Sequence, residues 1–392
     1  MTNDIYIAGA IRTPIGKFGG SLVEFSAVDL GEIAARAALE SAGVAPTEIA
    51  ETLIGHGRQA GCGPNPARQI AVRAGVPEST PAMTVNQACA SGLRTIALAV
   101  QAAQMGEGEV FLVGGTESMS NTPYLLPRAR WGYRLGHGEL VDGMYRDGFD
   151  CPIAEQRMGR TAENLVEELG ITREEQDRYA LQSQQRAAGA RDRLREELVP
   201  IALTDRKGRT TEFASDEHVR GDATLEKLAR LPPVFKEGGS VHAGNSSGIT
   251  DGAAAAIVLT GAAAERLTVQ PMARIVAAAN VGVEARRMGL GPVRAVQTLL
   301  EKTNLTLDDI DLIELNEAFA AQVLACRREL RFDMDKTNLN GGAIALGHPI
   351  GCSGTRIAVT LLHEMRRRRA RYGIATLCVS GGMGMAVLFE RV

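Results

Sequence analysis

The stretch Asn86-Gln-Ala-Cys-Ala-Ser-Gly92 lies where an apolar, strand-like segment, residues 81–85, gives way to a helical pattern. Cys89 stands at its centre. The unpaired N–H groups and the positive dipole end of a helix N-terminus favour a thiolate, and a thiolate is a nucleophile. The structural alternative for this stretch alone is a small, buried, unreactive cysteine. The rest of the chain has to decide between the two.

Strand-like and helical patterns alternate on both sides of this stretch. A helical pattern over residues 28–42 separates strand-like segments that begin at Ile5 and Thr52. The helix that follows Cys89 leads to a buried apolar strand that begins at Val110. This alternation predicts an α/β fold with a largely parallel sheet.

The same order returns in the last third of the chain. At a shift of 261 residues, residues 34–40 align with residues 295–301. At a shift that is one residue longer, Ser91-Gly-Leu-Arg matches Ser353-Gly-Thr-Arg. Two matches in the same order, at nearly the same offset, predict a duplicated α/β unit.

We also match the strand ending at Gly114-Gly115 with the one ending at Gly381-Gly382. The two copies differ at the nucleophile, because Gly351 aligns with Cys89. The second copy offers His348 and, at the end of a strand, Cys378. In open α/β sheets, functional groups gather at the carboxyl ends of strands and at helix N-termini. We therefore expect these three side chains to meet.

The segment between the copies, residues 118–248, differs from them in amino-acid composition and is interpreted as an insertion. It is rich in Arg, Gly and Pro, with a charged helix expected over residues 173–197. A strand over residues 253–260 completes the first copy. The predicted division is a first half of residues 1–117 plus 249–270, the insertion, and a second half of residues 271–392. Long functional loops of this kind are expected to cover the active edge of the sheet.

Composition excludes several classes of function. The net charge of −3 gives no footprint for nucleic acid or for an anionic membrane surface. The six cysteines form no CxxC pair, so no metal site or disulfide framework is indicated. Strand-like residues from Ile5 leave no room for a signal peptide, and no apolar run is long enough to span a membrane. We predict a cytoplasmic protein with reduced thiols.

Four blocks of the sequence resemble the thiolase family, in its acetyl-CoA acetyltransferase branch, and the resemblance covers essentially the whole chain. The blocks are Asn86-Gln-Ala-Cys-Ala-Ser-Gly92, Asn316-Glu-Ala-Phe-Ala320, Gly347-His-Pro-Ile-Gly-Cys-Ser-Gly354 and Cys378-Val-Ser-Gly-Gly-Met-Gly384. The resemblance implies a duplicated five-layer α/β/α/β/α fold, with an inserted loop domain for coenzyme A and oligomer contacts. It also implies coenzyme A thioesters as substrates, no permanently bound cofactor, and a homo-oligomer, either a dimer or a homotetramer.

Carried over by motif, the resemblance gives each catalytic residue a role. Cys89 is acylated, His348 accepts the proton of Cys89, and Cys378 moves the α-proton of the substrate. Asn316 with a water, together with His348, would face one oxyanion, and the backbone N–H groups of Cys89 and Ser380 another. The structural alternatives are a turn residue for His348, a buried strand residue for Cys378 and a helix cap for Asn316.

The resemblance also implies the substrate-binding residues. The segment Ala243-Gly-Asn-Ser-Ser247 resembles the loop that binds pantetheine, with Ser247 as the contact. Arg220 and Phe235 match positions at the adenine end, for which a surface charge and a loop anchor are the alternatives. Positions of the acyl pocket are matched by Met158, Met288 and Phe319, with core packing as the alternative.

Two residues depart from the family pattern. Ser380 stands where many members have Gly, and Arg157 stands where short-chain biosynthetic members often have His. The resemblance therefore implies an acetyl-CoA C-acetyltransferase that condenses two acetyl-CoA by a ping-pong mechanism through acetyl-Cys89. A longer-chain 3-ketoacyl-CoA thiolase of fatty-acid β-oxidation is the alternative.

Two other classes remain open at this stage. Ketoacyl synthases share the duplicated fold but usually pair their cysteine with two histidines, whereas the third residue here is Cys378. A catalytically silent coenzyme A binding or scaffold protein would typically have lost a nucleophile or a base. The chain keeps Cys89, His348 and Cys378.

Overall fold

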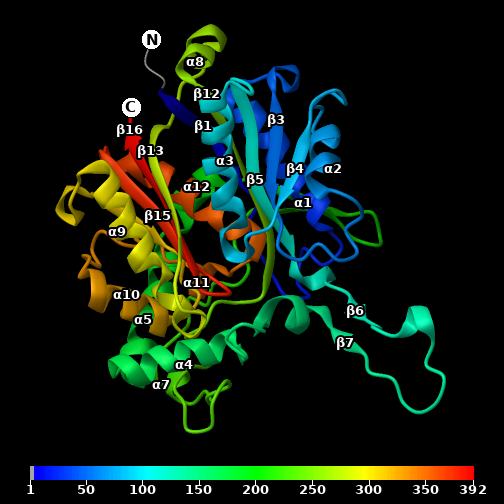
Figure 1. Ribbon diagram of the computed structural model, residues 1–392, viewed down its shortest axis with the longest axis vertical. Coiled ribbons are helices and arrows are strands. Elements are labelled where there is room, and N and C mark those ends of the chain that lie inside the picture. The colour runs from blue at the N-terminus through cyan, green and yellow to red at the C-terminus, as the bar shows by residue number, and fades with distance from the viewer. Residues whose placement is uncertain (1–3) are drawn as a thin grey trace.

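The computed structural model describes residues 4–392, and in this part of the chain ten strands form one mixed sheet (Figure 1). Its main strands run in the order β14-β15-β16-β13-β1-β12-β5-β3-β4. The first half supplies β1 (Ile5–Arg12), β2 (Gly16–Lys17), β3 (Glu51–Gly55), β4 (Ala82–Val85), β5 (Val110–Ser118) and β12 (Thr250–Thr260). The second half supplies β13 (Ala273–Gly282), β14 (Leu312–Leu315), β15 (Tyr372–Val379) and β16 (Met383–Arg391).

The sheet consists of two equivalent half-sheets joined at β1 and β13. The two strands pair only at Tyr6 with Arg274 and at Ile7 with Ala273. The pairs β3·β4, β3·β5 and β14·β15 are parallel, and the other pairs of this sheet are antiparallel. The prediction of a largely parallel sheet was wrong, because each half ends in a strand that returns without a crossover helix. A tight turn leads from β15 to β16, and the insertion returns as β12.

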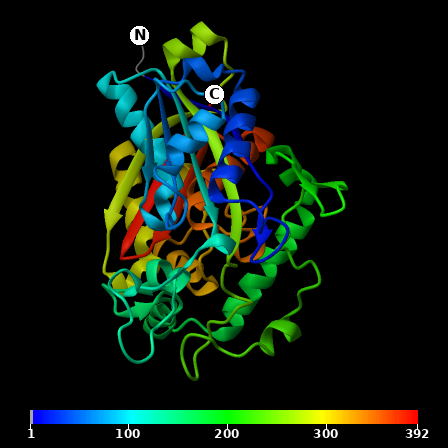
Figure 2. The same cartoon turned by 90° about the vertical axis from the view of Figure 1, so that its right-hand side faces the viewer.

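Helices separate the half-sheets and cover them, which gives five layers (Figures 1 and 2). α3 (Ser91–Met105) and α12 (Ile350–Arg368) lie between the half-sheets, and their apolar side chains share one core cluster with strands of both halves. α1 (Ala27–Ala42) and α2 (Pro66–Arg73) cover the first half-sheet. α9 (Gly291–Thr303) and α10 (Ala320–Leu330) cover the second. The predicted five-layer duplicated fold is confirmed.

The central helices approach closely at their first turns, where the sequence repeat places equivalent glycines. A Cβ on Gly92 would lie 2.8 Å from the carbonyl oxygen of Gly351, and one on Gly354 would lie 2.3 Å from the backbone nitrogen of Leu93. Side chains at these positions would force the helices apart. The repeated Ser-Gly pair is thus a packing requirement of the crossing helices.

The other matched pair of glycines is not equivalent. Gly114 and Gly115 lie inside β5, which continues to Ser118, whereas Gly381 and Gly382 form the turn after β15. Both turn glycines have positive φ, 85° and 86°. The match between Gly114-Gly115 and Gly381-Gly382 was therefore wrong. The first pair allows close packing within a strand, whereas the second forms a tight turn.

The insertion carries short strands and helices around the lower end of the sheet (Figure 1). Its strands are β6 (Tyr124–Leu125), β7 (Val141–Asp142), β8 (Asp150–Cys151), β9 (Gln156–Arg157), β10 (Ile201–Thr204) and β11 (Thr210–Phe213). Its helices are α4 (Met158–Leu169), α5 (Arg173–Gly189), α6 (Arg191–Leu194) and α7 (Leu225–Ala229). Two further helices lie outside it, α8 (Gly261–Leu267) and α11 (Ala343–Leu346).

The single helix expected over residues 173–197 is broken. α5 begins at a capping box between Thr172 and Glu175 and ends at Gly189, and α6 and a 3₁₀ turn follow. The break lets Glu197 turn inward to Arg12, where the side-chain atoms Nε and Oε1 lie 2.5 Å apart. Both side chains are buried, so this ion pair fixes the insertion to β1.

Residues 4–392 contain no helix long and apolar enough to cross a membrane. The same residues hold no group of three or more His, Cys, Asp or Glu side chains placed to bind a metal ion.

Candidate active site

A cavity of about 370 Å³ lies where strand ends of both halves meet the insertion. Of the predicted site residues, all except Asn316 line it: Cys89, His348, Cys378, Ser380, Ser247, Ala243, Arg220, Phe235, Met158, Met288 and Phe319. Residues far apart in the chain, with three chemically complementary groups among them, thus converge on one concave site.

Cys89 stands on a sharp turn between β4 and α3. Ala88, directly before it, has a φ of +46°, a conformation that costs a non-glycine residue energy. Side chains on either side hold the turn, since Asn86 Oδ1 accepts from the N–H of Ala88 at 2.9 Å and Ser91 Oγ donates to the Ala88 carbonyl at 2.6 Å. The strained turn presents the thiol to the cavity in a fixed direction.

Burial raises the pKa of Cys89 above its ordinary value. The backbone N–H of Ser380, the Arg58 guanidinium and the backbone N–H of Cys89 act in the opposite direction, and Glu117 adds to the rise. The backbone donors favour the thiolate, as expected of a helix N-terminus, but desolvation of the sulfur outweighs them. A base is therefore needed to take the proton from Cys89.

His348 lies between α11 and α12, with its ring in the cavity wall. Its Nδ1 lies 2.5 Å from Ser353 Oγ, and that hydroxyl donates to the carbonyl of Pro349 at 2.9 Å. Because the single hydroxyl hydrogen is used on Pro349, Oγ accepts from Nδ1–H, and this arrangement leaves Nε2 without a proton. His348 is held in the tautomer that a base requires.

Burial, then the charges of Arg356 and Arg58, lower the pKa of His348 to about 3, while Glu117 opposes the shift. The imidazole is therefore neutral at physiological pH. A neutral ring with a free Nε2 can accept a proton from Cys89 and return it later.

Cys378 ends β15 in the same cavity wall, and its thiol is fully buried. Burial, with the nearby Cys89 and Cys326, raises its pKa well above the ordinary value. Ser380 follows in the turn, and its backbone N–H lowers the pKa of Cys89. The side chain that replaces the family's glycine leaves this donor in place.

Asn316 lies at the end of β14, fully buried. Neither side-chain atom, Oδ1 or Nδ2, has a hydrogen-bond partner within residues 4–392. Its role as a helix cap is excluded, because α10 begins only at Ala320 with Phe319 as the preceding residue. A buried amide with free donor and acceptor sites is suited to hold a water molecule.

Glu317, next to Asn316, fixes this segment. Its carboxylate accepts from the hydroxyls of Tyr179 and Ser183, each at 2.6 Å, and from the N–H of Ile344 at 3.1 Å. It thereby connects the Asn316 segment to α5 of the insertion and to α11, which leads to His348.

The predicted substrate loop, residues 243–248, is fixed by its backbone to both catalytic segments. The N–H of Ser247 donates to the Ala318 carbonyl at 3.0 Å, and the N–H of His348 donates to the Gly248 carbonyl at 3.0 Å. The loop therefore forms a rigid wall of the cavity next to the candidate base. Arg220 lies further out in the cavity wall and is exposed.

The apolar wall comes from the start of α4, the loop before the 243–248 segment, the 3₁₀ turn at residues 285–290 and the residue before α10. Met158, Met288, Phe235 and Phe319 pack in one cluster with Cys378. The rings of Phe235 and Phe319 meet edge to face, with centroids 6.1 Å apart. A Cβ on Gly159 would lie 2.3 Å from the Phe235 ring, so this glycine makes room for it. The cluster suits an alkyl chain.

Sequence reasoning missed a charged group behind Cys89. Glu117, on β5, accepts from the backbone N–H groups of Gly57 at 3.0 Å, Arg58 at 3.1 Å and Gly351 at 2.9 Å. Its Oε1 also lies 3.0 Å from Nε2 of His56. The signal was a lone carboxylate in an otherwise apolar strand, and a buried carboxylate needs partners.

The pair of His56 and Glu117 is charged. Burial opposes protonation of His56, but Cys62 and Glu117 raise its pKa to about 9. Burial likewise opposes ionisation of Glu117, and the hydrogen bond from His56 lowers its pKa. The pair ties the end of β3 to the first turn of α12 beside His348.

This arrangement defines an acyl-transferring enzyme of the duplicated α/β type, with a cysteine nucleophile, an imidazole base and a second thiol. Family models agree: residues 5–262 match "Thiolase, N-terminal domain" and residues 269–391 match "Thiolase, C-terminal domain". The chain belongs to the thiolase family.

Relatives match over their full lengths. An acetyl-CoA acetyltransferase of Cupriavidus necator is 48% identical, with 99% of both chains covered, and one of Chromobacterium violaceum is 49% identical, with 99% of this chain and 100% of the relative covered. The structure resembles the Bacillus anthracis acetyl-CoA acetyltransferase, with a TM-score of 0.97, 44% identity and coverage of 100% and 99%. It also resembles human mitochondrial 3-ketoacyl-CoA thiolase in complex with CoA, with a TM-score of 0.95, 42% identity and coverage of 100% and 98%.

Proposed function

We propose that the chain is an acetyl-CoA C-acetyltransferase, which condenses two acetyl-CoA to acetoacetyl-CoA and coenzyme A and also runs in reverse. The observation that carries this proposal is the convergence of Cys89, His348 and Cys378 on one cavity. The names of the bacterial relatives support the acetyl group as the one transferred.

The first half-reaction acylates Cys89. His348 Nε2 takes the proton from the thiol, and the sulfur attacks the thioester carbonyl of acetyl-CoA. The tetrahedral oxyanion faces the backbone N–H groups of Cys89 and Ser380, both of which lower the pKa of this thiol. As the bond to coenzyme A breaks, His348 returns the proton to the leaving thiolate.

The second half-reaction forms the carbon–carbon bond. Cys378 passes its thiol proton to the neutral His348, and the resulting thiolate removes an α-proton from a second acetyl-CoA, whose enolate oxygen is stabilised by His348 and by a water on Asn316. The enolate carbon then attacks acetyl-Cys89, the bond to the Cys89 sulfur breaks, and the released Cys89 thiolate takes the proton back from His348. The high pKa of Cys378 matches the weak acidity of an α-proton, since a strong base is needed to remove it.

Coenzyme A thioesters are the proposed substrates, and no permanently bound cofactor is required by these steps. Ser247 and Ala243 would line the pantetheine, with Phe235 and the exposed Arg220 further out. Met158, Met288 and Phe319 would contact the acyl group, because they share an apolar cluster with Cys378.

A longer-chain 3-ketoacyl-CoA thiolase is the second candidate, favoured by the likeness to the human enzyme of that name. A thiolysis series on the purified protein, from acetoacetyl-CoA to 3-ketohexadecanoyl-CoA, separates the two. The proposal predicts the highest kcat/KM for acetoacetyl-CoA. Equal or better use of the long chain would contradict it.

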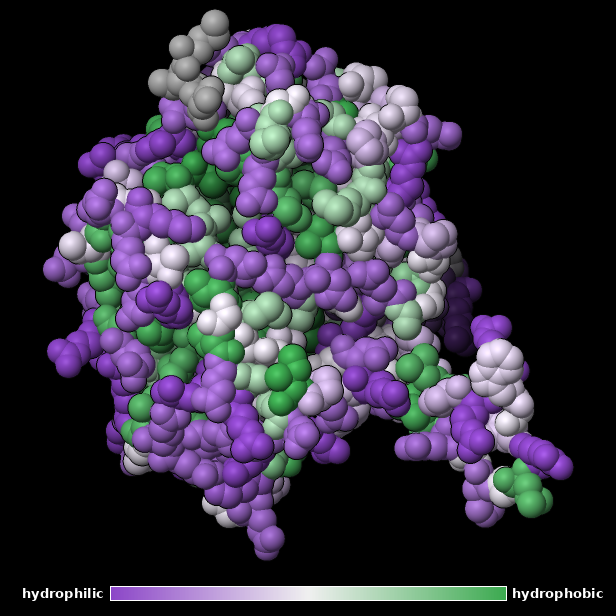
Figure 3. Space-filling model, in the orientation of Figure 1, coloured by the Kyte–Doolittle hydropathy of each residue, from purple (hydrophilic) through white to green (hydrophobic). Residues whose placement is uncertain are grey.

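We further propose a homo-oligomer, a dimer or a tetramer. The arm that contains β6 and β7 projects from the body (Figures 1 and 3) and exposes Trp131 and Leu135, at 86% and 96%. Large exposed apolar side chains on a projecting arm are typical of protein contacts. Replacing both with Ser is expected to reduce the mass measured by light scattering, while a wild-type monomer would contradict this proposal.

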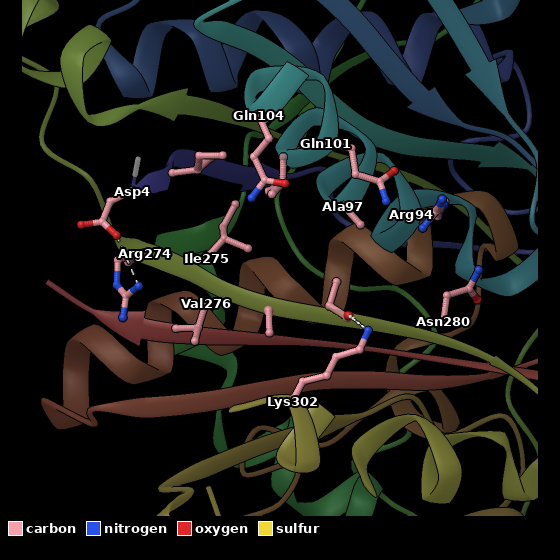
Figure 4. Close-up of a pocket in the computed structure, with 14 residues that line it drawn as sticks. Asp4, Arg94, Ala97, Gln101, Gln104, Arg274, Ile275, Val276, Asn280 and Lys302 are labelled. Atoms are coloured by element: carbon pink, nitrogen blue, oxygen red, sulfur yellow. Dashed lines mark hydrogen bonds and ion pairs between the residues drawn. The ribbon is translucent and has the colours of Figure 1, made fainter. Parts of the chain in front are cut away.

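A second hollow, of about 510 Å³, lies between α3 and β13 and is remote from the catalytic thiols. Part of its polar lining is paired: Lys302 donates to the Ala278 carbonyl at 3.2 Å, and Arg274 pairs with Asp4 at 3.4 Å (Figure 4). Figure 3 shows hydrophobic surface on the same face. A face of this kind supports a contact between copies of the chain, and no chemistry is assigned to it.

We also propose a reducing compartment, the cytoplasm. All six cysteines are free thiols in the described part of the chain, and Cys89 and Cys378 must both be reduced for the steps above.

A further inference from the structure

Arg58 carries a buried guanidinium in the wall of the catalytic cavity. It lies three residues after Gly55, which ends β3, and only 6% of the residue is exposed. Its Nε and Nη2 atoms have no hydrogen-bond partner among residues 4–392. A buried cation without a partner is costly, so an anion is expected to approach it during function.

The surroundings of Arg58 hold the guanidinium in one place. The ring of Phe149 lies 5.4 Å from its central carbon, in a cation–π contact. A Cβ on Gly148 would lie 1.6 Å from Nη2, so the guanidinium packs against the bare backbone there. Glu117 binds the backbone N–H of Arg58 at 3.1 Å. The charge is therefore fixed by packing, and its position is built into the fold.

The charges around Arg58 do not neutralise it. Glu117, which binds the backbone N–H of Arg58, is already paired with the protonated His56. Among the described residues, no carboxylate oxygen lies within 4.0 Å of the Arg58 guanidinium. With His348 and both catalytic thiols neutral at rest, Arg58, His56 and Glu117 together carry one excess positive charge.

The wider cavity offers a contrast in Arg157. Its guanidinium lies over Tyr145, 5.0 Å from the ring centre, and Tyr145 meets Phe149 edge to face. However, its side chain is 59% exposed, and it pairs with Asp150 at 3.5 Å. Two arginines thus flank one aromatic pair, one solvated and paired, the other buried and unpaired.

We propose that Arg58 is the positioning residue whose charge stabilises the thiolate of Cys89. The inference rests on the proposed function, in which the S–H bond of Cys89 breaks, the proton moves to His348 Nε2 and the electron pair stays on sulfur. Arg58 exchanges no proton in this step. The anion that forms on Cys89 lies in the same cavity as the Arg58 charge, and the proton held by His348 leaves the total charge of the site unchanged until it passes to the leaving group.

The electrostatics agree with this assignment. The Arg58 charge lowers the pKa of Cys89 against the effect of burial, and it also contributes to the low pKa of His348. Cys89 is further faced by His348, Cys378 and Glu117, and the outer cavity holds the titratable or charged side chains of Asp147, Arg157, His218 and Arg220. Arg58 thus favours the thiolate and disfavours the imidazolium, so His348 holds the proton only until the leaving thiolate of coenzyme A takes it.

The test is the pH profile of Cys89 alkylation by iodoacetamide, followed by peptide mass mapping. Arg58→Met should move the midpoint up by about one pH unit, which slows alkylation roughly tenfold below the midpoint. Arg58→Lys keeps the charge and should retain most of the wild-type profile. Arg157→Met, which removes the solvated arginine of the same aromatic pair, should leave the midpoint unchanged.

An Arg58→Met midpoint equal to that of wild type would overturn the proposal. An unchanged midpoint with a loss confined to substrates whose acyl group carries a carboxylate would also overturn it, and would assign Arg58 to substrate binding. If Arg58→Met does not fold, Arg58→Gln compared with Arg58→Lys carries the same test. Iodoacetamide needs no coenzyme A, so failure here is distinguishable from failure of wild-type Cys89 to accept an acetyl group from acetyl-CoA.

Discussion

The first turns of α3 and α12 are equivalent in the duplicated fold, yet they do opposite work. Before α3, a strained turn presents Cys89 to the cavity. At the equivalent position of α12 stands Gly351, where a Cβ would lie 2.4 Å from the Thr116 carbonyl oxygen and 2.8 Å from Cα of His56. The second half has no room for a nucleophile at this point, because the strand ends of the first half fill it.

The second half supplies proton-transfer groups, which lie just outside the contact made by Gly351. His348 precedes α12 by two residues, and Cys378 ends the strand equivalent to β5. Duplication placed two strand-to-helix junctions at one point, and divergence divided the work, with the nucleophile in one half and the proton-transfer groups in the other. Substitutions in one half at a time test this division of roles.

The largest expected effect comes from removing the nucleophile. Cys89→Ala should lose acetyl transfer by a factor of at least roughly 10⁴, because the other thiol of the cavity, Cys378, has the proton-transfer role and does not replace the nucleophile. Binding of coenzyme A, measured by calorimetry, should persist, since the residues proposed to bind it lie outside this turn. Substantial residual turnover would mean that the halves are not divided as described.

Removing the base of the second half should have the next largest effect. His348→Gln is expected to slow acylation of Cys89 by roughly 10²–10⁴-fold, as is typical of a lost general base. Rapid-quench mass measurement of the acetyl-enzyme gives the rate. Ser353→Ala is the matched control, and it should cost less because it removes only the acceptor that holds Nδ1–H. Normal acylation in His348→Gln would place the base elsewhere.

Stability should show the tight contact between the halves. Gly351→Ala is expected to lower the free energy of unfolding by about 1–3 kcal/mol through overpacking. Gly189→Ala, at the end of α5 with open space around it, serves as the control and should be neutral or slightly stabilising. Equal unfolding midpoints for the two variants would show that the halves do not meet as tightly as the structure indicates.

The smallest effect concerns the pair that ties the halves together. Because the pKa of His56 is raised from 6.5 to about 9 on folding, its stabilisation is full below pH 6.5 and is lost as the pH rises through about 9. His56→Gln should therefore be less stable than wild type near neutral pH, by the order of 1 kcal/mol, and the difference should shrink in alkali. Urea unfolding at several pH values measures it, and a constant difference would contradict the pairing.

Much of this could be predicted from the sequence, for identifiable reasons. Motifs such as the one around Cys89 are contiguous, so each predicted block kept its place, and the family assignment was confirmed. The repeat of Ser91-Gly92 at Ser353-Gly354 revealed the duplication, because the crossing helices demand small residues at both sites.

Other features depend on contacts that no local pattern encodes. Strand direction was misjudged because the alternation of strands and helices does not show that β16 follows a tight turn and that β12 returns from the insertion. The role of Arg58 was not predicted, because it depends on a buried charge that has no hydrogen-bond partner at Nε and Nη2 within the described part of the chain, and the sequence does not show this. The pKa of Cys89 follows from burial, which a helix N-terminus alone does not reveal.

The central claim is that the first half supplies the nucleophile and the second half supplies the base that removes the α-proton. The variant Cys378→Ser tests it most directly. The measurement is tritium release from the methyl group of acetyl-CoA, together with the amount of acetyl-Cys89 formed. We predict wild-type levels of acetyl-enzyme with tritium release reduced by roughly 10²–10⁴-fold, because a serine hydroxyl cannot replace a thiolate base. Unimpaired release, or failure to acetylate Cys89, would contradict the division of roles between the halves.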